Sequence, residues 1–179
     1  MKISSKKLTG GQAAVKSLKK EQVKHVFGLI GSATMEMFDA LYHEKKIKFI
    51  DVRDERTGTH MADGYARASN QPGVIIAGQN GPGATNLVTG LAQAKAAFSP
   101  VVSLAGLYST KDNMEDAFQG LDQQSLFEPV TKKTITLRNS KNIPNAISDG
   151  FNIAMSPRRG PVCINLPRNL LAEKNNFKI

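Results

Sequence analysis

The sequence predicts an α/β fold, a three-layer domain with about six mainly parallel strands and helices on both faces of the sheet. Two observations predict it. Short apolar runs alternate with helix-like runs through the whole chain, and parallel strands need such crossover connections. The runs "GVIIAG" and "PVVSLAG" are also short and apolar on both faces, as strands buried in a parallel sheet are.

Each predicted element rests on a short local pattern. Ala14, Leu18 and Val23 recur along one face of the first helix, and Ser32 is a suitable N-cap for the second. The predicted strands lie near residues 23–29, 47–53, 73–78, 100–106, 132–138 and 161–166. The predicted helices lie near residues 9–22, 33–44, 56–69, 83–98, 121–128 and 142–156.

Length and composition fit one ordinary globular domain. The chain has 179 residues, of which 40% are hydrophobic and 22% charged, enough for a sizeable core. We expect a tail at 1–8, the domain at 9–171 and a C-terminal tail or the start of a linker at 172–179. No apolar run has the length of a membrane span, and no secretory signal is present. The one cysteine, Cys163, reads as a buried residue in a reducing compartment, so we expect a cytoplasmic protein.

The chain is basic, with a net charge of +9 and a pI of about 9.7. Its lysines and arginines are dispersed and are not interleaved with aromatic residues, and no nucleic-acid-binding motif appears. We therefore expect no nucleic acid and no membrane as partner. The basic surface is either solvated or faces an acidic partner.

Three features follow predicted strands at one edge of the sheet. They are the loop "FGLIGSA" at 27–33, the loop "GQNGPGATN" at 78–86 and the acid Glu55. Ligands of open α/β sheets bind at that edge. Each feature also has a simpler interpretation, because a Gly-Pro-Gly turn needs no ligand and an acid at a helix start is favoured by the helix dipole.

Five motifs in order resemble the N-terminal pyrimidine-binding domain of thiamine-diphosphate-dependent enzymes. They are "HVFGLIGSA", "DERTGTHMADGYAR", "GQNGPGATN", "DAFQGLD" and "GPVCINLPRNLL". The resemblance spans roughly residues 7–171 and points to the acetolactate synthase-like group. Within it, "GSATM" and "GQNGPG" resemble sulfoacetaldehyde acetyltransferase more than a typical acetolactate synthase. The resemblance implies half of the active site of a carboligase or decarboxylase that acts on 2-oxo acids or related aldehydes.

The resemblance also implies roles for single residues. Glu55 matches the glutamate that hydrogen-bonds N1′ of the aminopyrimidine and so promotes removal of the C2 proton of the cofactor. Gln119, beside Phe118, matches a glutamine in the reaction chamber. The residues implied to bind the cofactor are Ile30, Gly31, Ser32, Glu55, Pro82 and Asn86.

Some positions depart from the family pattern. Leu29 to Ser32 replace a common Tyr-Pro-Gly-Gly, Asp54 replaces a histidine, and Gln79-Asn80 replaces Thr-Ser. These changes fit either a different substrate or sequence drift. His60 is interpreted as a helix-packing histidine rather than a general base. No set of side chains has metal-ligand spacing, so no metal site is predicted in the chain.

The resemblance implies thiamine diphosphate as cofactor and leaves a flavin requirement open. Mg²⁺ would be held by a diphosphate-binding domain or subunit outside this chain, because the family's Gly-Asp-Gly motif is absent. It also implies a homodimer through the 82–98 region and a small-molecule substrate. Two alternatives stay open: the small subunit of a two-chain sulfopyruvate decarboxylase-like enzyme, and a non-catalytic α/β interaction module.

Overall fold

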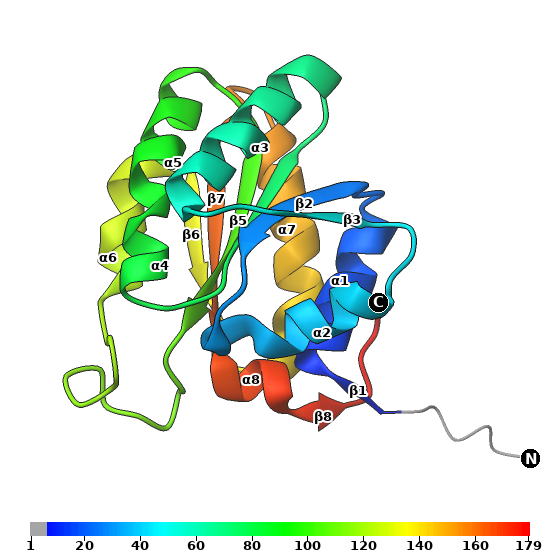
Figure 1. Cartoon of the computed structure of the whole chain (residues 1–179), viewed down its shortest axis with the longest axis vertical. Helices are drawn as coiled ribbons and strands as arrows, with labels where there is room; N and C mark the ends of the chain where they lie inside the picture. The colour runs from blue at the N-terminus through cyan, green and yellow to red at the C-terminus, as the bar shows by residue number, and fades with distance from the viewer. Residues whose placement is uncertain (1–6) are drawn as a thin grey trace, which may run out of the picture.

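The computed structural model describes residues 7–179 and contains the predicted parallel sheet (Figure 1). The strand order is β3-β2-β4-β5-β7-β6, and every neighbouring pair is parallel. The strands are β2 (His25–Leu29), β3 (Lys48–Asp51), β4 (Gly73–Ala77), β5 (Val101–Leu107), β6 (Lys133–Thr136) and β7 (Val162–Pro167). The predicted fold class is therefore confirmed, with each strand close to its predicted place.

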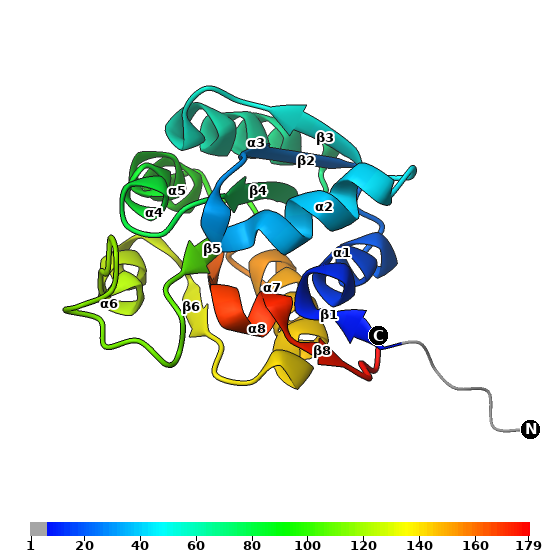
Figure 2. The same cartoon turned by 60° about the horizontal axis from the view of Figure 1, so that its bottom comes forward.

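Helices cover both faces of the sheet (Figure 2). One face carries α1 (Gly10–Lys20), α2 (Met35–His43), α7 (Ile143–Met155) and α8 (Arg168–Ala172). The other face carries α3 (Glu55–Ser69), α4 (Pro82–Thr85), α5 (Leu87–Ala96) and α6 (Gln123–Phe127). Three short 3₁₀ turns complete the connections: η1 (Ser32–Thr34), η2 (Glu128–Val130) and η3 (Ser140–Asn142).

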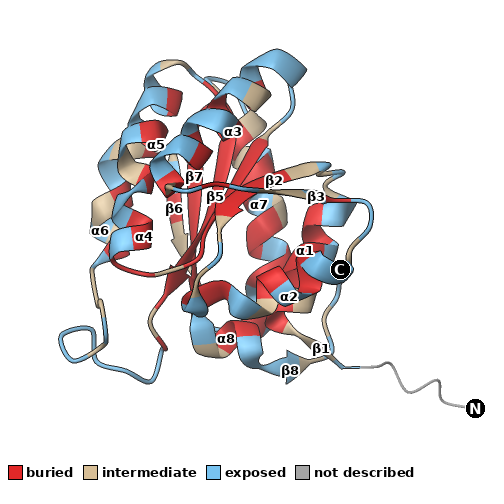
Figure 3. Cartoon of the chain, in the orientation of Figure 1, coloured by how far each residue is buried: buried red, intermediate tan, exposed pale blue. Residues whose placement is uncertain are grey.

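The core consists of two apolar layers separated by the sheet. Successive side chains of a strand point to opposite faces, so Val74 and Ile76 of β4 pack under α1, α2 and α7 while Ile75 and Ala77 pack under α3 and α5. All four of these side chains are fully buried. Figure 3 shows the same result for the central strands as a whole, which are buried along their length. This explains why their sequences are apolar at successive positions.

Local sequence signals set the helix starts. Thr9 and Gln12 form a capping box before α1, in which each side chain accepts a hydrogen bond of 3.1 Å from the other's backbone N–H. Asp54 caps α3 by accepting a bond of 2.7 Å from the backbone N–H of Arg56. The next residue, Glu55, is thereby fixed as the first residue of α3.

Three local features differ from the prediction. Leu8–Thr9 and Lys174–Asn175 form a short antiparallel ribbon, β1 with β8, although tails were expected at 1–8 and 172–179 and the first helix was expected to begin at Thr9. Residues 1–6 of the expected N-terminal tail lie outside the described residues. The single helix expected over 83–98 is divided at Asn86 into α4 and α5, and the short helix α8 was not expected. Within residues 7–179, no helix is long and apolar enough to cross a bilayer.

Candidate functional site

The chain changes direction in the sheet beside β2, and this creates a place for a ligand. The connection from β2 to β3 runs through α2 on one face, and the chain after β4 enters α4 and α5 on the other. The loops after β2 and β4 therefore leave the carboxyl edge of the sheet in opposite directions. Ligands of open α/β sheets bind in the crevice between such loops.

Glu55 lies at this edge with its carboxylate almost completely buried. The residue is 4% exposed. Its Oε2 accepts a hydrogen bond of 3.0 Å from Nδ2 of Asn86. Its Oε1 has no hydrogen-bond partner among residues 7–179, yet solvent reaches this atom. A buried carboxylate is costly unless its oxygens are paired, so Oε1 is an acceptor that a ligand's donor would stabilise.

Gly83 packs closely beside that free oxygen. A Cβ atom at this position would lie 3.0 Å from Oε1 of Glu55 and 3.2 Å from Cβ of Gln79. Any larger residue would therefore crowd both side chains. Pro82 is exposed at the first position of α4, next to Gly83. The Gly-Pro-Gly segment is thus more than a tight turn, because its second glycine borders the carboxylate.

The loops after β2 and β4 touch through their backbones. A Cβ at Gly31 would lie 2.4 Å from the carbonyl carbon of Gly78, and the backbone N–H of Ala33 donates to the carbonyl oxygen of Gly78 over 3.0 Å. Only glycine at both positions permits this approach. Ile30 and Ser32 flank Gly31 and are both exposed, so the predicted cofactor-binding loop presents its side chains outward at the carboxyl edge.

Gln79 connects this loop to Gln119. The Ser32 hydroxyl donates to Oε1 of Gln79 over 2.8 Å, and Nε2 of Gln79 donates to Oε1 of Gln119 over 2.8 Å. Nδ2 of Asn80 donates to the carbonyl oxygens of Phe118 and Gln119, each over 2.8 Å. These contacts bring Gln119, 87 positions after Ser32 in the sequence, to the same edge.

Gln119 is held in a backbone conformation that is unfavourable for its residue type. Its φ is +57°, in the left-handed region that glycine and asparagine prefer. Gly81, with a φ of +59°, packs against it, and a Cβ at Gly81 would lie 2.7 Å from the Gln119 carbonyl oxygen. Strained residues of this kind persist where surrounding contacts over-determine them, and they cluster at functional sites.

The structure thus brings the predicted site residues into two neighbouring groups. Glu55, Asn86 and Gly83 form one group, and Ser32, Gln79 and Gln119 form the other. Gln79 borders both. The roles of Gln79 and Asn80 were missed, although both follow directly after β4 at the predicted edge, which was the available signal. The interpretation of His60 as a packing residue was wrong, because its side chain is exposed within this chain.

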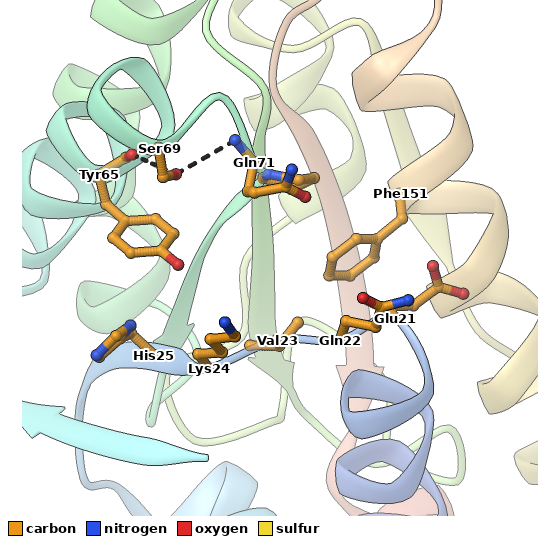
Figure 4. A pocket seen from close by; sticks show the side chains of 10 residues that line it. Glu21, Gln22, Val23, Lys24, His25, Tyr65, Ser69, Gln71 and Phe151 are labelled. Atoms are coloured by element: carbon orange, nitrogen blue, oxygen red, sulfur yellow. Dashed lines mark hydrogen bonds between the residues drawn. The ribbon is translucent and has the colours of Figure 1, made fainter. Parts of the chain in front are cut away.

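A separate cavity lies at the opposite edge of the sheet (Figure 4). Its volume is about 350 Å³, and it lies between the start of β2 and the last turns of α3. Tyr65 and Phe151 stand on opposite sides of it, with Lys24 between them (Figure 4). Tyr65 is ten positions after Glu55 along α3, or about 15 Å of helix. This cavity is therefore distinct from the predicted site.

The described part of the chain offers no obvious metal site. Residues 7–179 contain no group of three or more His, Cys, Asp or Glu side chains that could hold a metal ion. The side chains that form the two groups described above carry one carboxylate, several amides and a hydroxyl. This set suits hydrogen bonds to an organic ligand better than ligation of a cation.

The fold is a parallel α/β sheet, and the loops at its carboxyl edge bring buried and exposed polar side chains together where such folds commonly bind organic ligands. Residues 8–126 match the family model of the thiamine pyrophosphate enzyme, N-terminal TPP binding domain. This match covers more than half of the chain, and the chain belongs to that family. The resemblance found in the sequence motifs is confirmed.

The chain is also similar in sequence to acetolactate synthases. The chain is 42% identical over 163 residues to a probable acetolactate synthase large subunit of Methanocaldococcus jannaschii. The aligned region covers 91% of this chain and 27% of that protein. It is 39% identical over 170 residues to the acetolactate synthase isozyme 3 large subunit of Escherichia coli. That alignment covers 95% of this chain and 29% of the Escherichia coli protein. A mitochondrial acetolactate synthase catalytic subunit of Aspergillus candidus is 39% identical to this chain over 164 residues. That alignment covers 92% of this chain and 24% of the Aspergillus protein. The chain thus spans about a quarter of the length of these relatives.

Proposed function

We propose that this chain is the pyrimidine-binding half-site of a thiamine-diphosphate-dependent carboligase or decarboxylase acting on 2-oxo acids or related aldehydes. The Glu55 carboxylate supports this proposal most directly. It is buried, one oxygen is held by Asn86, and the other is free beside Gly83. The similarity to acetolactate synthases supports the reaction class.

The residues of the site have complementary roles in this proposal. Thiamine diphosphate, when bound, supplies a C2 carbon that can attack a carbonyl group after it loses its proton. Glu55 shares a proton at Oε1 with a ring nitrogen of the pyrimidine, which is general acid–base catalysis. Asn86 fixes the plane of the carboxylate through Oε2, so that Oε1 keeps its direction.

The remaining predicted residues shape the space around that carboxylate. Ile30, Gly31, Ser32 and Pro82 border the pyrimidine, and Gly83 leaves room for it. Gln119 faces the substrate from the other side of Gln79. The proposal therefore divides the edge into a cofactor end at Glu55 and a substrate end at Gln119.

The diphosphate and Mg²⁺ require partners outside this chain. A diphosphate needs a cation and a cradle of N–H groups, and the described residues hold no metal-ligand cluster. We propose a diphosphate-binding domain or subunit as partner, in the manner of acetolactate synthase or of a two-chain sulfopyruvate decarboxylase-like enzyme. The chain alone should therefore bind thiamine diphosphate weakly.

A non-catalytic interaction module is the second candidate. The fold alone would serve both functions, since a parallel α/β sheet hosts many activities. The Glu55 site disfavours the module, because a carboxylate that is only 4% exposed is costly to bury and a purely structural domain gains nothing from it.

The test replaces Glu55 with glutamine in the enzyme that also carries the diphosphate-binding domain. Glu55→Gln keeps the size and the hydrogen bonding but removes the acid. Exchange of the C2 proton with deuterium, followed by NMR, should slow by about 10²–10⁴-fold, the usual contribution of general acid–base catalysis. The variant should remain folded, because an acid in the first turn of a helix contributes about 1 kcal/mol at most.

Exchange within a few-fold of wild type would reject the catalytic role and favour the interaction module. Glu36→Gln is a suitable control. Glu36 is also an acid in the first turn of a helix, α2, but it has no place in the proposed site. It should leave the exchange rate unchanged.

A further inference from the structure

Three side-chain amides and one hydroxyl form a hydrogen-bonded chain at the substrate end of the site. Its order is Ser32, Gln79 and Gln119, with Asn80 alongside. An amide has a donor end and an acceptor end, so the direction of each amide decides what the next one can do. The direction of each hydrogen bond in this series follows from Asn80, whose amide orientation is fixed by its partners.

Asn80 is the fixed end, because its partners are backbone carbonyls. Its Nδ2 contacts the carbonyl oxygens of Phe118 and Gln119, each at 2.8 Å. Carbonyl oxygens only accept hydrogen bonds, so the atom that contacts both must be the nitrogen. Both amide hydrogens of Asn80 are thereby used, and its Oδ1 must point the other way.

The orientation of Asn80 determines that of Gln79. Nε2 of Gln79 lies 3.5 Å from Oδ1 of Asn80 and 2.8 Å from Oε1 of Gln119. With Gln79 reversed, its oxygen would face the Asn80 oxygen. In the observed orientation its Oε1 accepts from the Ser32 hydroxyl at 2.8 Å.

The orientation of Gln79 in turn determines that of Gln119. A donor holds Oε1 of Gln119, so Nε2 of Gln119 points away from Gln79. This nitrogen has no hydrogen-bond partner among residues 7–179, and solvent reaches it. The chain of amides therefore ends in an accessible N–H donor pair.

We propose that Gln79 is a positioning residue that makes Gln119 present a hydrogen-bond donor to the substrate. The substrate group at this position is then an acceptor, namely a carboxylate, a sulfonate or a carbonyl oxygen. This inference rests on the proposed function, because it takes Gln119 to face the reaction chamber. Gln79 has the length to reach both Ser32 and Gln119, which the threonine common at this position in the family lacks.

The orientation can be tested in the chain alone, without cofactor or substrate. In a ¹⁵N-labelled sample, the side-chain amide protons of Gln79 should exchange with solvent several-fold more slowly than those of Gln119. Ser32→Ala should leave the slow exchange of Gln79 in place, because Gln79 donates to Gln119 and not to Ser32. Slow exchange at Gln119 in the wild type, or loss of the Gln79 protection in Ser32→Ala, would overturn the proposal.

Two substitutions of similar size test the control that Gln79 exerts. Gln79→Glu has only acceptors, so Gln119 must turn and donate to it, and the Gln119 amide protons should become protected. Gln79→Met has no hydrogen-bonding group comparable to the amide, so Gln119 should stay unprotected. Equal Gln119 exchange in the two variants would refute a positioning role.

In the complete enzyme, Gln79→Glu should raise KM for an anionic substrate about tenfold or more, because it removes one hydrogen bond to a charged group and adds a like charge, and should lower kcat less. The neutral Gln79→Met, which leaves Gln119 free, should raise KM less. An unchanged KM, or an equal loss in kcat, contradicts the acceptor assignment. The amide measurements do not involve Glu55. Normal C2-proton exchange in Glu55→Gln would therefore reject the proposed function, and the amide spectra would still decide the orientation.

Discussion

Asn86 donates a hydrogen bond of 3.0 Å to Oε2 of Glu55, and so joins the residue that divides α4 from α5 to the first residue of α3. This contact ties the loop after β4 to the loop after β3. Within residues 7–179, it leaves the second oxygen of Glu55, Oε1, without a hydrogen-bond partner.

We expect Asn86→Ala to lower the free energy of unfolding by about 1 kcal/mol, the net value of a typical hydrogen bond. Asn86→Asp should destabilise the fold more at pH 7, because it brings two carboxylates together. Stability of Asn86→Asp should then increase as the pH falls and one carboxyl is protonated. Urea titrations at pH 7 and pH 5 measure both effects, and a pH-independent difference between the two variants would contradict the contact.

Gly83→Ala should lower the free energy of unfolding by about 1–3 kcal/mol, as overpacking does. The added Cβ would lie 3.0 Å from Oε1 of Glu55. Gly64→Ala is the matched control, because a Cβ at Gly64 in α3 meets nothing within 4 Å. The free energy of unfolding of Gly64→Ala should rise by about 0.5–1 kcal/mol, since alanine is favoured over glycine inside a helix. Thermal or urea unfolding should show that the free energy of unfolding falls in Gly83→Ala and rises in Gly64→Ala. A rise in both variants would show that the Glu55 side chain moves to accommodate the new methyl group.

Asn80→Ala should loosen the loop that carries Gln119. It removes both donors from the carbonyl oxygens of Phe118 and Gln119, which hold the left-handed backbone there. The backbone amides of Ala117 and Gly120, which are hydrogen-bonded within the loop, should exchange with deuterium faster.

Asn113→Ala is the control for the loop. Asn113 is exposed in the same loop, and its side chain makes only a 3.4 Å contact with Asp116. Its removal should leave the exchange of Gly120 unchanged. Similar acceleration in both variants would show that the loop does not depend on Asn80.

Cys163 should resist thiol reagents in the folded protein. It is fully buried in β7, and burial raises the pKa of its thiol from 9.0 to about 12. Between those two pH values an exposed thiol in the unfolded chain ionises and the folded one does not. Stability should therefore decrease as the pH rises above about 9. Labelling with a disulfide reagent at pH 8 should proceed only as the protein unfolds, and fast labelling without denaturant would show that β7 opens locally.

We expect the chain to form a homodimer through the 82–98 region. Gly90 and Ala94 of α5 are buried within the chain, where Gly90 meets Thr59 of α3. Thr89 and Ala92 of the same helix are exposed. Small exposed residues permit close approach of a second copy around a two-fold axis.

Light scattering at increasing concentration should show the dimer. Ala92→Glu should give a monomer with an unchanged circular dichroism spectrum, because its side chain is exposed in the monomer, and with a Tm that no longer depends on protein concentration. Monomer at every concentration for the wild type would contradict this interface.

The sheet could be predicted because burial on both faces makes a parallel strand apolar along its length, and Val74 to Ala77 carry that pattern. The break at Asn86 could not be predicted, since "GATNLVTGLAQA" continues a helical pattern through it. Asn86 bonds to Glu55, 31 positions away, and no local pattern encodes this contact. The β1–β8 ribbon has two residues in each strand, too few for a periodicity.

The site residues stay predictions, and they came from the sequence by two routes. Topology alone assigned Glu55 and the two glycine-containing loops to one edge of the sheet, whereas the roles of Pro82 and Asn86 were implied by the resemblance to thiamine-diphosphate enzymes. The network of Gln79 depends on the left-handed backbone of Gln119 and on its contact with Asn80. That geometry exists only after the loop has folded against β4, so the sequence shows Gln79 merely as an unusual residue.

The strand order also determines when the domain can form during synthesis. Among residues 7–179, β6 pairs only with β7, and β7 lies between β6 and β5 although it comes last among the six strands. A nascent chain that ends before residue 162 therefore has an unpaired β6 and an open edge on β5, the kind of edge that invites aggregation. Sheet closure is a late event with contacts between distant residues, and such topologies fold slowly. Truncating the chain between residues 137 and 161, or slowing its synthesis there, should thus lower the yield of folded protein, although this segment lies far from Glu55 in the sequence.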